Sequence, residues 1–424
     1  MKTRTIVGAV VVLGVLLLPL GVAQAQDRPE LPSAISFSGI PFNFAPPGAR
    51  SLGMGAAFIG IADDATAAEA NPAGLTILTR PEASAHFRFS SYNIDFYNPT
   101  AYDVQSAYDQ GNGIGTYDQS VSTPSFFSFV KPFRGVVLSV YYQQAADFKG
   151  TASFGAFDSF FTDQYTVTEN VKFQLEHIGV SLAFRLGDRV ALGFSARNSR
   201  LSLRSLDELR VDYWRDLPDE PNVTDYFGLA TRFDDHDTAL TYNIGLLINP
   251  NGKFSMGVVY KKGGKYNLNG IFEGFDVCEG TGCYPNPFFL PGQVAVKTTF
   301  RVPDVIGIGF ALRPSDQLTF AADAVQISYS DLRFEGQTEK LDNAVEAHFG
   351  FEYTFFPGGG EIPFSIRAGV FTDPDHDGYA QINSDDTHYT IGAGVVTKGN
   401  FQIDVAYSFS DRVDEGILSF VYRF

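Results

Sequence analysis

A short acidic run near the C-terminal end of the chain has residue types that bind calcium. Asp373, Asp375 and Asp377 alternate with other residues, and Gly378 follows directly. This spacing puts carboxylates at positions 1, 3 and 5 of a calcium loop and glycine at position 6. Ser384 stands at position 12, where a bidentate Glu is usual, so the motif is incomplete. The run predicts either a Ca²⁺ site or a solvated acidic turn, and we expect no other cofactor.

The two cysteines of the chain, Cys278 and Cys283, are separated by Glu-Gly-Thr-Gly. Two cysteines cannot supply the four ligands of a structural zinc site. If the chain is exported, they cross an oxidising compartment, so we favour a local Cys278–Cys283 disulfide. A redox role is the alternative, although the Cys-x-x-Cys spacing is missing.

Residue patterns of hydrolytic enzymes are missing from the sequence. It contains no Gly-x-Ser-x-Gly elbow, and its six histidines are scattered without a clear His/Asp/Ser arrangement. General acid–base chemistry needs such groups side by side. We therefore expect that the protein is not an enzyme.

The N-terminal residues indicate export. Two basic residues precede the apolar stretch 6–22, and the small-x-small pattern Ala-Gln-Ala follows at 23–25. This order is typical of a secretory signal peptide, which we assign to residues 1–25. The alternative, a membrane anchor, is disfavoured because the stretch is short for a span of about 20 residues and contains Pro19.

Composition narrows the class of protein further. The chain has a formal net charge of −17, which disfavours nucleic acid as a partner. It contains 40 Phe, 20 Tyr and 42 Gly, a composition that favours a β-rich protein with a large aromatic surface. After the signal peptide, no run of 18 apolar residues predicts a helical span.

From Glu82 to the C-terminus, apolar residues recur at every second position in segments of about ten residues, as in the strands of membrane barrels. The last segment places Leu418, Phe420, Tyr422 and Phe424 on one face and ends on that aromatic residue. Such an ending is typical of the closing strand of a bacterial outer-membrane barrel.

Very short turns alternate with longer polar connections along residues 82–424. Counting hairpins gives about 14 strands, an even number, as bacterial outer-membrane barrels have. The predicted fold class is all-β: a transmembrane, antiparallel, up-and-down β-barrel over residues 82–424. A soluble β-sandwich is the alternative, but the alternation of short and long connections favours the barrel.

In such a barrel the polar faces of the strands point into the lumen. Buried charges are expected to pair with each other or with a plug. The charged and titratable residues predicted to line the lumen are Arg185, Arg197, Glu346, His348, Glu352, Arg367, Asp404 and Arg423.

Residues 26–81 are not strand-like, and we interpret them as a plug folded inside the lumen. Asp63 or Asp64 is placed to cap a short helix, and Asn71-Pro72 to end it in a turn. The segment is too hydrophobic for a disordered tail. A 14-stranded barrel is also wider than side chains alone can fill.

Several of these motifs resemble one family. Residues 53–58 (Gly-Met-Gly-Ala-Ala-Phe), 62–65 (Ala-Asp-Asp-Ala) and 71–74 (Asn-Pro-Ala-Gly) are similar to the N-terminal hatch signature of FadL-type outer-membrane transporters. The resemblance continues at 302–309 and 364–370 and spans nearly the whole chain after the signal peptide.

The resemblance implies a 14-stranded barrel with an N-terminal hatch at residues 26–81. It also implies passive transport of long-chain fatty acids or other hydrophobic molecules across the outer membrane. Ligand would pass from an outer groove to a lumenal pocket near the hatch and leave sideways through a gap in the wall. The expected partners are a hydrophobic small molecule and membrane lipid, with the protein a monomer. The residues assigned to the hatch motif are Asp63, Asp64, Asn71, Pro72 and Ala73.

Phenylalanines in the connections are candidates for the outer ligand groove, because an acyl chain kept against Phe retains about 0.8 kcal/mol of burial per CH₂. Ordinary loop packing or an aromatic girdle explains them equally well. These residues are Phe154, Phe157, Phe160, Phe161, Phe288 and Phe289.

A second function is consistent with the same hatch motif, which also resembles PorV-type barrels. These act as scaffolds or shuttles of a protein secretion system. A continuous apolar path ending at a kinked strand favours transport. A sealed lumen with an apolar outer platform favours the scaffold.

Overall fold

The computed structural model describes residues 44, 46–97, 114–158, 163–212, 224–279, 292–332, 341–359, 362–374, 385–397 and 400–424. The predicted signal peptide, residues 1–25, lies outside the described residues.

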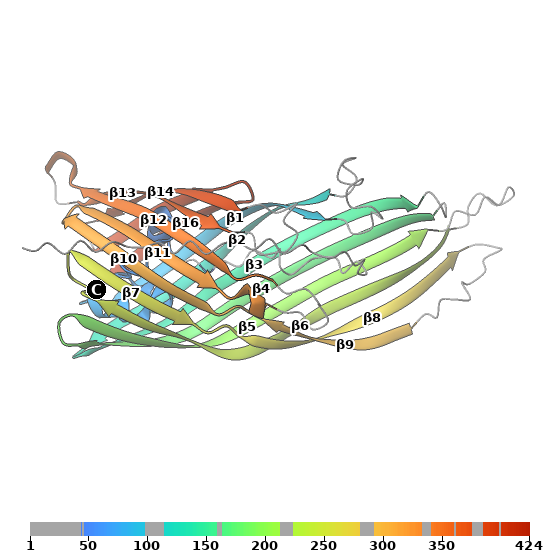
Figure 1. Cartoon of the computed structure of the whole chain (residues 1–424), viewed down its shortest axis with the longest axis horizontal. Helices are drawn as coiled ribbons and strands as arrows, with labels where there is room; N and C mark the ends of the chain where they lie inside the picture. The colour runs from blue at the N-terminus through green and yellow to red at the C-terminus, as the bar shows by residue number, and fades with distance from the viewer. Residues whose placement is uncertain are drawn as a thin grey trace, which may run out of the picture. The chain divides into compact units, whose positions relative to one another are not determined.

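Most of the described chain forms one antiparallel sheet (Figure 1). Its strand segments are β1 (Glu82–Tyr97), β2 (Ile114–Phe133), β3 (Val136–Asp158), β4 (Asp163–Leu186), β5 (Val190–Asp212), β6 (Thr224–Ile248), β7 (Phe254–Lys261), β8 (Lys265–Glu279), β9 (Gly292–Arg301), β10 (Val305–Ser315), β11 (Leu318–Ile327), β12 (Ala344–Phe355), β13 (Phe364–Asp373), β14 (Asp386–Val396), β15 (Phe401–Phe409) and β16 (Val413–Arg423). The short helices are α1 (Ala49–Gly53), α2 (Ala67–Ala70) and the 3₁₀ turns η2 (Pro72–Ile77), η3 (Tyr329–Asp331) and η4 (Pro357–Gly359).

The sheet closes on itself, because β1 pairs with both β2 and β16. β7 and β8 both pair with β6, so they are two parts of one strand interrupted at residues 262–264. β9 and β10 pair with β8 and β7 and are likewise parts of one strand, interrupted at residues 302–304. The 16 described segments therefore make a closed 14-stranded barrel, as the sequence predicts.

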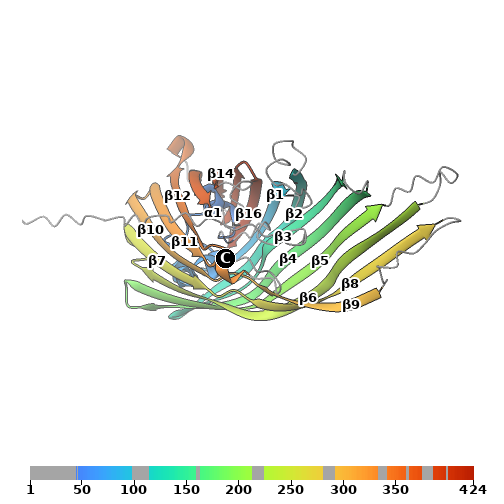
Figure 2. The same ribbon diagram turned by 45° about the vertical axis from the view of Figure 1, so that its right-hand side comes forward.

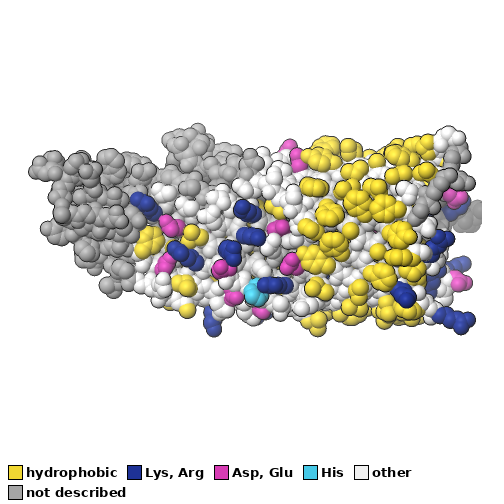
Figure 3. Space-filling model, turned by 180° about the vertical axis from the view of Figure 1, so that it is seen from behind, with side chains coloured by type: hydrophobic (Ala, Val, Ile, Leu, Met, Phe, Trp, Pro, Cys, Tyr) yellow, Lys and Arg dark blue, Asp and Glu magenta, His cyan; other side chains and the backbone are white. Residues whose placement is uncertain are grey.

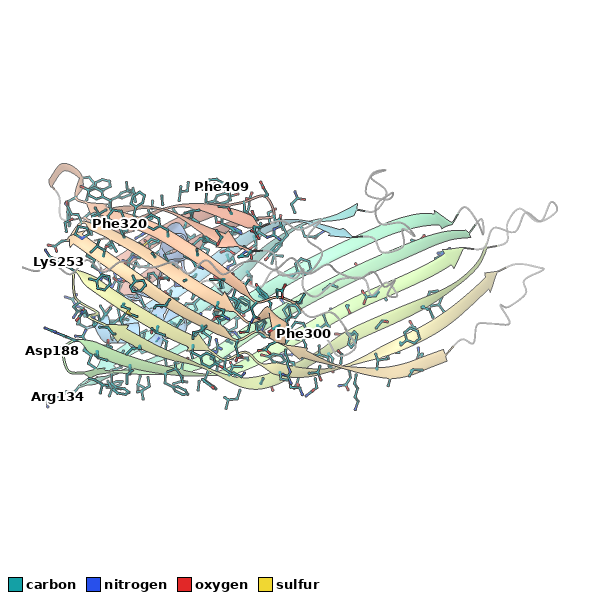
Figure 4. All side chains as sticks on the ribbon, in the orientation of Figure 1. Arg134, Asp188, Lys253, Phe300, Phe320 and Phe409 are labelled. Atoms are coloured by element: carbon teal, nitrogen blue, oxygen red, sulfur yellow. The ribbon has the colours of Figure 1, made fainter. Side chains whose placement is uncertain are left out.

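Short turns collect at one end of the barrel, which we call the turn end. Arg134, Asp188 and Lys253 mark three of these turns and lie together at that end in Figure 4. At the opposite, far end, the described strands stop at the longer connections. This is the alternation of short and long connections that the sequence predicts.

Apolar side chains face outward in a band near the turn end. In β14, Tyr389 and Ile391 are 53% and 57% exposed, and in β12 Phe349 is 48% exposed. Figure 3 shows the band in yellow, with a zone of mixed charge beyond it toward the far end. The outward faces predicted from the alternation are therefore confirmed. None of the described helices has the length and apolarity needed to cross a membrane.

The wall is much taller on one side. Strands β3–β6 have 23–25 residues, whereas β10–β16 have 9–12. A membrane span needs about 9–11 residues, so the tall strands continue well past the apolar band. Figure 2 shows β3–β6, β8 and β9 rising together as one curved sheet. The sequence pattern of about ten residues per strand finds only the spanning part of these strands.

Residues 46–78, which we call the inner segment, lie inside the ring of strands. Helix α1 packs on β13–β16, and η2 packs on β3–β6, on the other side of the lumen. Almost all of the segment is buried; Phe58, Ile61 and Leu75 have no exposed area. The segment thus crosses the lumen from wall to wall at the level of the apolar band.

Candidate functional site

Glycines on the inward face of the wall let the inner segment approach as backbone against backbone. An added Cβ at Gly350 would lie 2.0 Å from the carbonyl oxygen of Met54, and one at Gly257 would lie 2.1 Å from that of Ile59. Such distances are far inside van der Waals contact, so no larger residue fits without a shift. We call these two positions, with Gly193, Gly245 and Gly369, the glycine seat.

The predicted Asn71-Pro72-Ala73 motif ties the inner segment to itself and to the wall. The Asn71 Nδ2 donates to the carbonyl oxygen of Ile59 at 3.0 Å and to that of Leu246 in β6 at 3.2 Å. Its Oδ1 accepts the N–H of Ala73 at 3.2 Å and so caps η2. Every polar atom of this buried amide is used, and Pro72 follows at the first position of the turn.

The two predicted aspartates have different roles. Asp63 forms an ion pair with Arg50 inside the segment. Asp64 accepts hydrogen bonds from the N–H and the hydroxyl of Thr66, just before α2 begins. Asp64 therefore organises the turn that leads into the helix, but Thr66 is the residue before α2 and no side chain caps the helix, so the predicted capping role is not found.

A chain of paired charges fixes α1 to the wall. Arg50 contacts Glu352 in β12 at 2.8 Å, and Glu352 also accepts from Arg367 in β13 at 2.6 Å. Arg367 in turn contacts Asp404 in β15 at 2.8 Å. The prediction that lumenal charges pair with each other or with a plug is confirmed for these residues.

A second charged cluster surrounds Glu69 of α2. The Glu69 carboxylate contacts Arg197 in β5 at 3.0 Å and Lys261 in β7 at 3.2 Å. It also accepts from the Tyr141 hydroxyl and the Asn243 amide, each at 3.0 Å. Burial acts to raise the pKa of Glu69, but the two cations outweigh it and lower that pKa to about 2. The cluster places two basic side chains against one carboxylate.

The remaining predicted lumenal residues also find partners. Arg185 donates to the carbonyl oxygen of Thr76 at 3.0 Å, and Arg423 pairs with Glu82 at 2.8 Å. His348 lies 3.2 Å from Glu346.

Beyond the inner segment, toward the far end, the lumen is lined by apolar side chains. Phe173 and Phe300 pack with ring centroids 5.4 Å apart, and Tyr92 and Phe148 with centroids 5.7 Å apart. Figure 4 shows Phe300 close to the junction of β9 and β10. The buried members of this apolar lining are Tyr92, Ala145, Ala146, Phe148, Val171, Phe173, Leu175, Leu201, Leu203, Phe233, Tyr266, Leu268, Phe300, Val302, Val305, Ile327, Tyr329, Leu332 and Ala344.

A pocket lies where the apolar lining meets the Glu69 cluster. Leu175, Tyr266 and Val302 contribute apolar surface, and Glu69 and Arg197 contribute charge. The pocket is therefore apolar toward the far end and charged on the side of the inner segment. Such a combination places charged groups beside apolar surface.

The wall beside this pocket is split between β2 and β3. Main-chain pairing of these strands ends at Phe126–Gln143, and beyond it β2 pairs only with β1 and β3 only with β4. Ser125 and Ala145 are extra residues at the start of the split, as in β-bulges. Gln143 and Ala145 also line the pocket. The Thr123 hydroxyl donates to the Gln144 amide oxygen across the split at 2.8 Å.

A second gap lies between β6 and β8, beside the same pocket. Main-chain pairing of β6 stops at Asn243–Lys261 and resumes at Phe233–Gly270. Residues 234–242 of β6 thus face residues 262–269 without a ladder, and the Lys262 N–H donates to the Tyr242 carbonyl oxygen at 2.8 Å. We call this stretch the window.

The other predicted site residues lie largely outside the described part of the chain. Phe154 and Phe157 belong to β3, but their side chains are not described, and Phe160, Phe161, Phe288 and Phe289 lie outside the described residues. The side chain of Cys278 is not described either, and Cys283, Asp375 and Asp377 lie outside the described residues. Asp373 is described, and its carboxylate lies 3.5 Å from Arg412. The groove, the disulfide and the calcium loop therefore stay predictions.

Sequence reasoning missed several residues of the site. Asp323 in β11 accepts the N–H groups of Phe58 and Ile59 at 2.7 and 2.8 Å. Glu69 and Lys261 were missed as well. Asp323 and Lys261 fall on the inward face of strands with alternating polarity, so the rule that found Arg197 would also have found them.

The sequence matches the family described as "Outer membrane protein transport protein (OMPP1/FadL/TodX)" over residues 44–417. A comparison with curated protein sequences finds no match.

Among solved structures, the fold is similar to a FadL homologue of Pseudomonas aeruginosa, with 17% identity, 91% of this chain and 99% of that chain covered, and a TM-score of 0.64. The toluene transporter TodX of P. putida gives 12% identity, 90% and 99% coverage and a TM-score of 0.62. The toluene transporter TbuX of Ralstonia pickettii gives 15% identity, with 90% of this chain and 99% of that chain covered, and a TM-score of 0.56.

Proposed function

We propose that this chain, which belongs to the OMPP1/FadL/TodX family of outer-membrane transport proteins, carries long-chain fatty acids or similar amphiphiles into the membrane. Membership places the protein in the bacterial outer membrane and among transport proteins rather than enzymes, as the sequence predicts. In an outer-membrane barrel the short turns face the periplasm, so the far end faces outward.

The observation that carries the proposal is the two-sided character of the pocket. Leu175, Tyr266 and the rest of the apolar lining offer an acyl chain about 0.8 kcal/mol per buried CH₂. Arg197 and Lys261 are two basic side chains that share the single carboxylate of Glu69. A ligand carboxylate would give these two side chains a second acceptor in a buried site, where charge-assisted hydrogen bonds are strong.

The structural relatives suggest a second class of ligand. Two of them, TodX and TbuX, are toluene transporters. A neutral aromatic hydrocarbon would use the apolar lining and would form no ion pair with Arg197 or Lys261. The cations therefore favour an anionic amphiphile over a hydrocarbon for this chain.

The proposed path runs from the far end along the apolar lining to the pocket. The inner segment acts as the hatch, because it crosses the lumen below the pocket and is held by the glycine seat and by ion pairs. The ligand leaves sideways through the split between β2 and β3. Phe89 and Phe127 on the outer face of β1 and β2 are 52% and 40% exposed, so the split lies within the apolar band. The family match gives no support to a secretion scaffold.

Uptake of labelled oleate by a deletion strain carrying the gene tests the proposal. Oleate uptake should depend on the protein and should fall with Arg197→Gln, whereas uptake of oleyl alcohol, which lacks the charge, should change little. Native mass spectrometry of the purified protein should show one copy of the chain with bound acyl ligand. Equal uptake of both lipids with and without the protein would contradict the proposal. Uptake of toluene but not of oleate would indicate that the ligand is an aromatic hydrocarbon.

A further inference from the structure

We propose that the window between β6 and β8 is a second lateral passage between the pocket and the outer leaflet of the membrane. The inference rests on the proposed transport of amphiphiles and adds a route beside the same pocket, separated from the β2–β3 split by strands β3–β6. It is carried by the pairing of the strands, the side chains that bridge the window, and the position of the pocket.

The window is a bounded interruption of main-chain pairing, separate from the β2–β3 split. Its outer neighbours are complete, since β5 pairs with β6 along the whole stretch and β8 pairs with β9 from Lys265 onward. Only the contact between β6 and the β7–β8 strand is lost, over residues 234–242 and 262–269. Pairing on either side of the window holds both edges in place while the centre has no ladder.

Carboxylates replace the missing ladder. The Asp237 side chain accepts the N–H of Asn267 at 2.7 Å, and Asp235 accepts the N–H and the side-chain amide of Asn269, both at 2.8 Å. These side chains can rotate away without disturbing either strand, whereas a main-chain ladder separates only when a strand moves. The two aspartates thus form a releasable latch.

The pocket reaches both edges of the window. Thr241 of β6 and Lys262, Gly263 and Gly264 of the interrupted strand line it together. Lys262 is also 45% exposed on its side chain, so the same residue borders the pocket and the outer surface. From inside, the Arg197 Nη2 donates to the carbonyl oxygen of Lys262 at 3.1 Å. A ligand carboxylate that engages Arg197 therefore acts directly on the window's edge.

The outer side of the window borders the membrane. Leu240 on β6 is 82% exposed and is followed along the outer face by Ile244, 48% exposed, so the window opens at the rim of the apolar band. Below it, Asp304 accepts from the Tyr260 hydroxyl at 2.6 Å, the Lys262 ammonium at 2.8 Å and the Gly263 N–H at 2.9 Å. This clamp gives the passage a firm lower rim beneath the releasable latch.

A disulfide across the window tests the inference. The test variant carries Asp237→Cys and Asn267→Cys in a Cys278→Ser and Cys283→Ser background. Oxidation of this variant should lower oleate uptake about twofold, because the disulfide closes one of two parallel passages. Reduction should restore it. The matched control joins the same two strands where they are fully paired, with Leu246→Cys and Val258→Cys, and should leave uptake unchanged.

A second lock separates this inference from the proposed function. Thr123→Cys with Gln144→Cys closes the β2–β3 split. If the disulfide across the split abolishes uptake and the disulfide across the window behaves like the control, the second passage is refuted while lateral transport stands. If neither lock matters and oleate does not bind, the proposed function itself fails. If each lock removes part of the uptake, the window is supported.

A photoreactive fatty acid gives a readout that does not depend on disulfide formation. Bound to the full-length protein in outer-membrane-like vesicles and mapped by mass spectrometry, it should label residues 237–242 and 262–267 as well as the strands that border the split. Labelling confined to the split would overturn the inference. Asp235→Ala with Asp237→Ala should raise the share of label at the window.

Discussion

The seat of the inner segment and the apolar lining occupy the same lumen but are stabilised in opposite ways. The seat uses paired charges and backbone contacts at glycines, each of which fits one geometry. The lining uses aromatic and aliphatic side chains, whose attraction to a partner is non-directional. The seat therefore binds a single fixed partner, the inner segment, whereas the apolar lining can receive ligands of varied shape.

Removing the central carboxylate of the seat should have the largest effect. Glu352→Ala takes one partner each from Arg50 and Arg367, and breaking a buried ion pair costs about 3–5 kcal/mol. Hydrogen exchange should show α1 opening much more often while the strands stay protected. The exposed pair Arg204–Asp234 supplies the control, since Asp234→Ala should cost less than about 1 kcal/mol. Equal effects of both variants would remove the distinction between the two regions.

A single methyl group should also unseat the inner segment. Gly350→Ala places a Cβ 2.0 Å from the Met54 carbonyl oxygen, and overpacking of this kind costs about 1–3 kcal/mol. The control is Gly416→Ala, where the nearest atom would be 3.6 Å away. Ion conductance of the reconstituted barrel should rise for the first variant only. Unchanged conductance in both would show that the seat tolerates a shift.

Acid should loosen α2 through Glu69. Because its folded pKa is lowered from the model-peptide value of 4.5 to about 2, its contribution is complete above pH 4.5 and is lost as the pH falls toward 2. The effect should be smaller than in Glu352→Ala, since a protonated Glu69 keeps several hydrogen bonds. Hydrogen exchange of residues 64–71, corrected for intrinsic rates, measures this. Glu69→Gln should show no such dependence on pH.

The apolar lining should tolerate exchange best. Phe300→Leu keeps an apolar side chain of similar size and should cost less than about 1.5 kcal/mol. Its effect should appear instead in the relative uptake of short and long fatty acids, because Phe300 packs with Phe173 beside the pocket. A loss of stability as large as in the seat, with no change in ligand preference, would contradict the comparison.

Most of the wall could be predicted from the sequence, because lipid on one side and a polar lumen on the other impose a strict period of two. This period locates the outward Tyr389 and Ile391 and the inward Arg367 alike. It cannot predict the tall upper parts of β3–β6, where water lies outside and the contrast between faces fades. Nor can it show that residues 262–264 and 302–304 interrupt two neighbouring strands at matching heights.

The site was predictable only in part. Asn71 and Pro72 stood out because Asn-Pro favours a turn and because they belong to the motif that resembles the hatch signature. Glu69 did not, since its partners Arg197 and Lys261 lie 128 and 192 positions away along the chain and meet it only in the closed barrel. The gaps in the wall depend on which strand segments fail to pair, and residue types alone do not determine that.

The glycine seat also imposes an order on assembly. The inner segment is made early, yet the N–H of Ala49 bonds to Ser419, 370 positions later, and Gly55 bonds to Thr390 in β14. Contacts so distant in sequence form late, because the entropy of closing the loop must be overcome before they contribute. These bonds of the segment made near the start of the chain can therefore form only after β14 and β16 are in place.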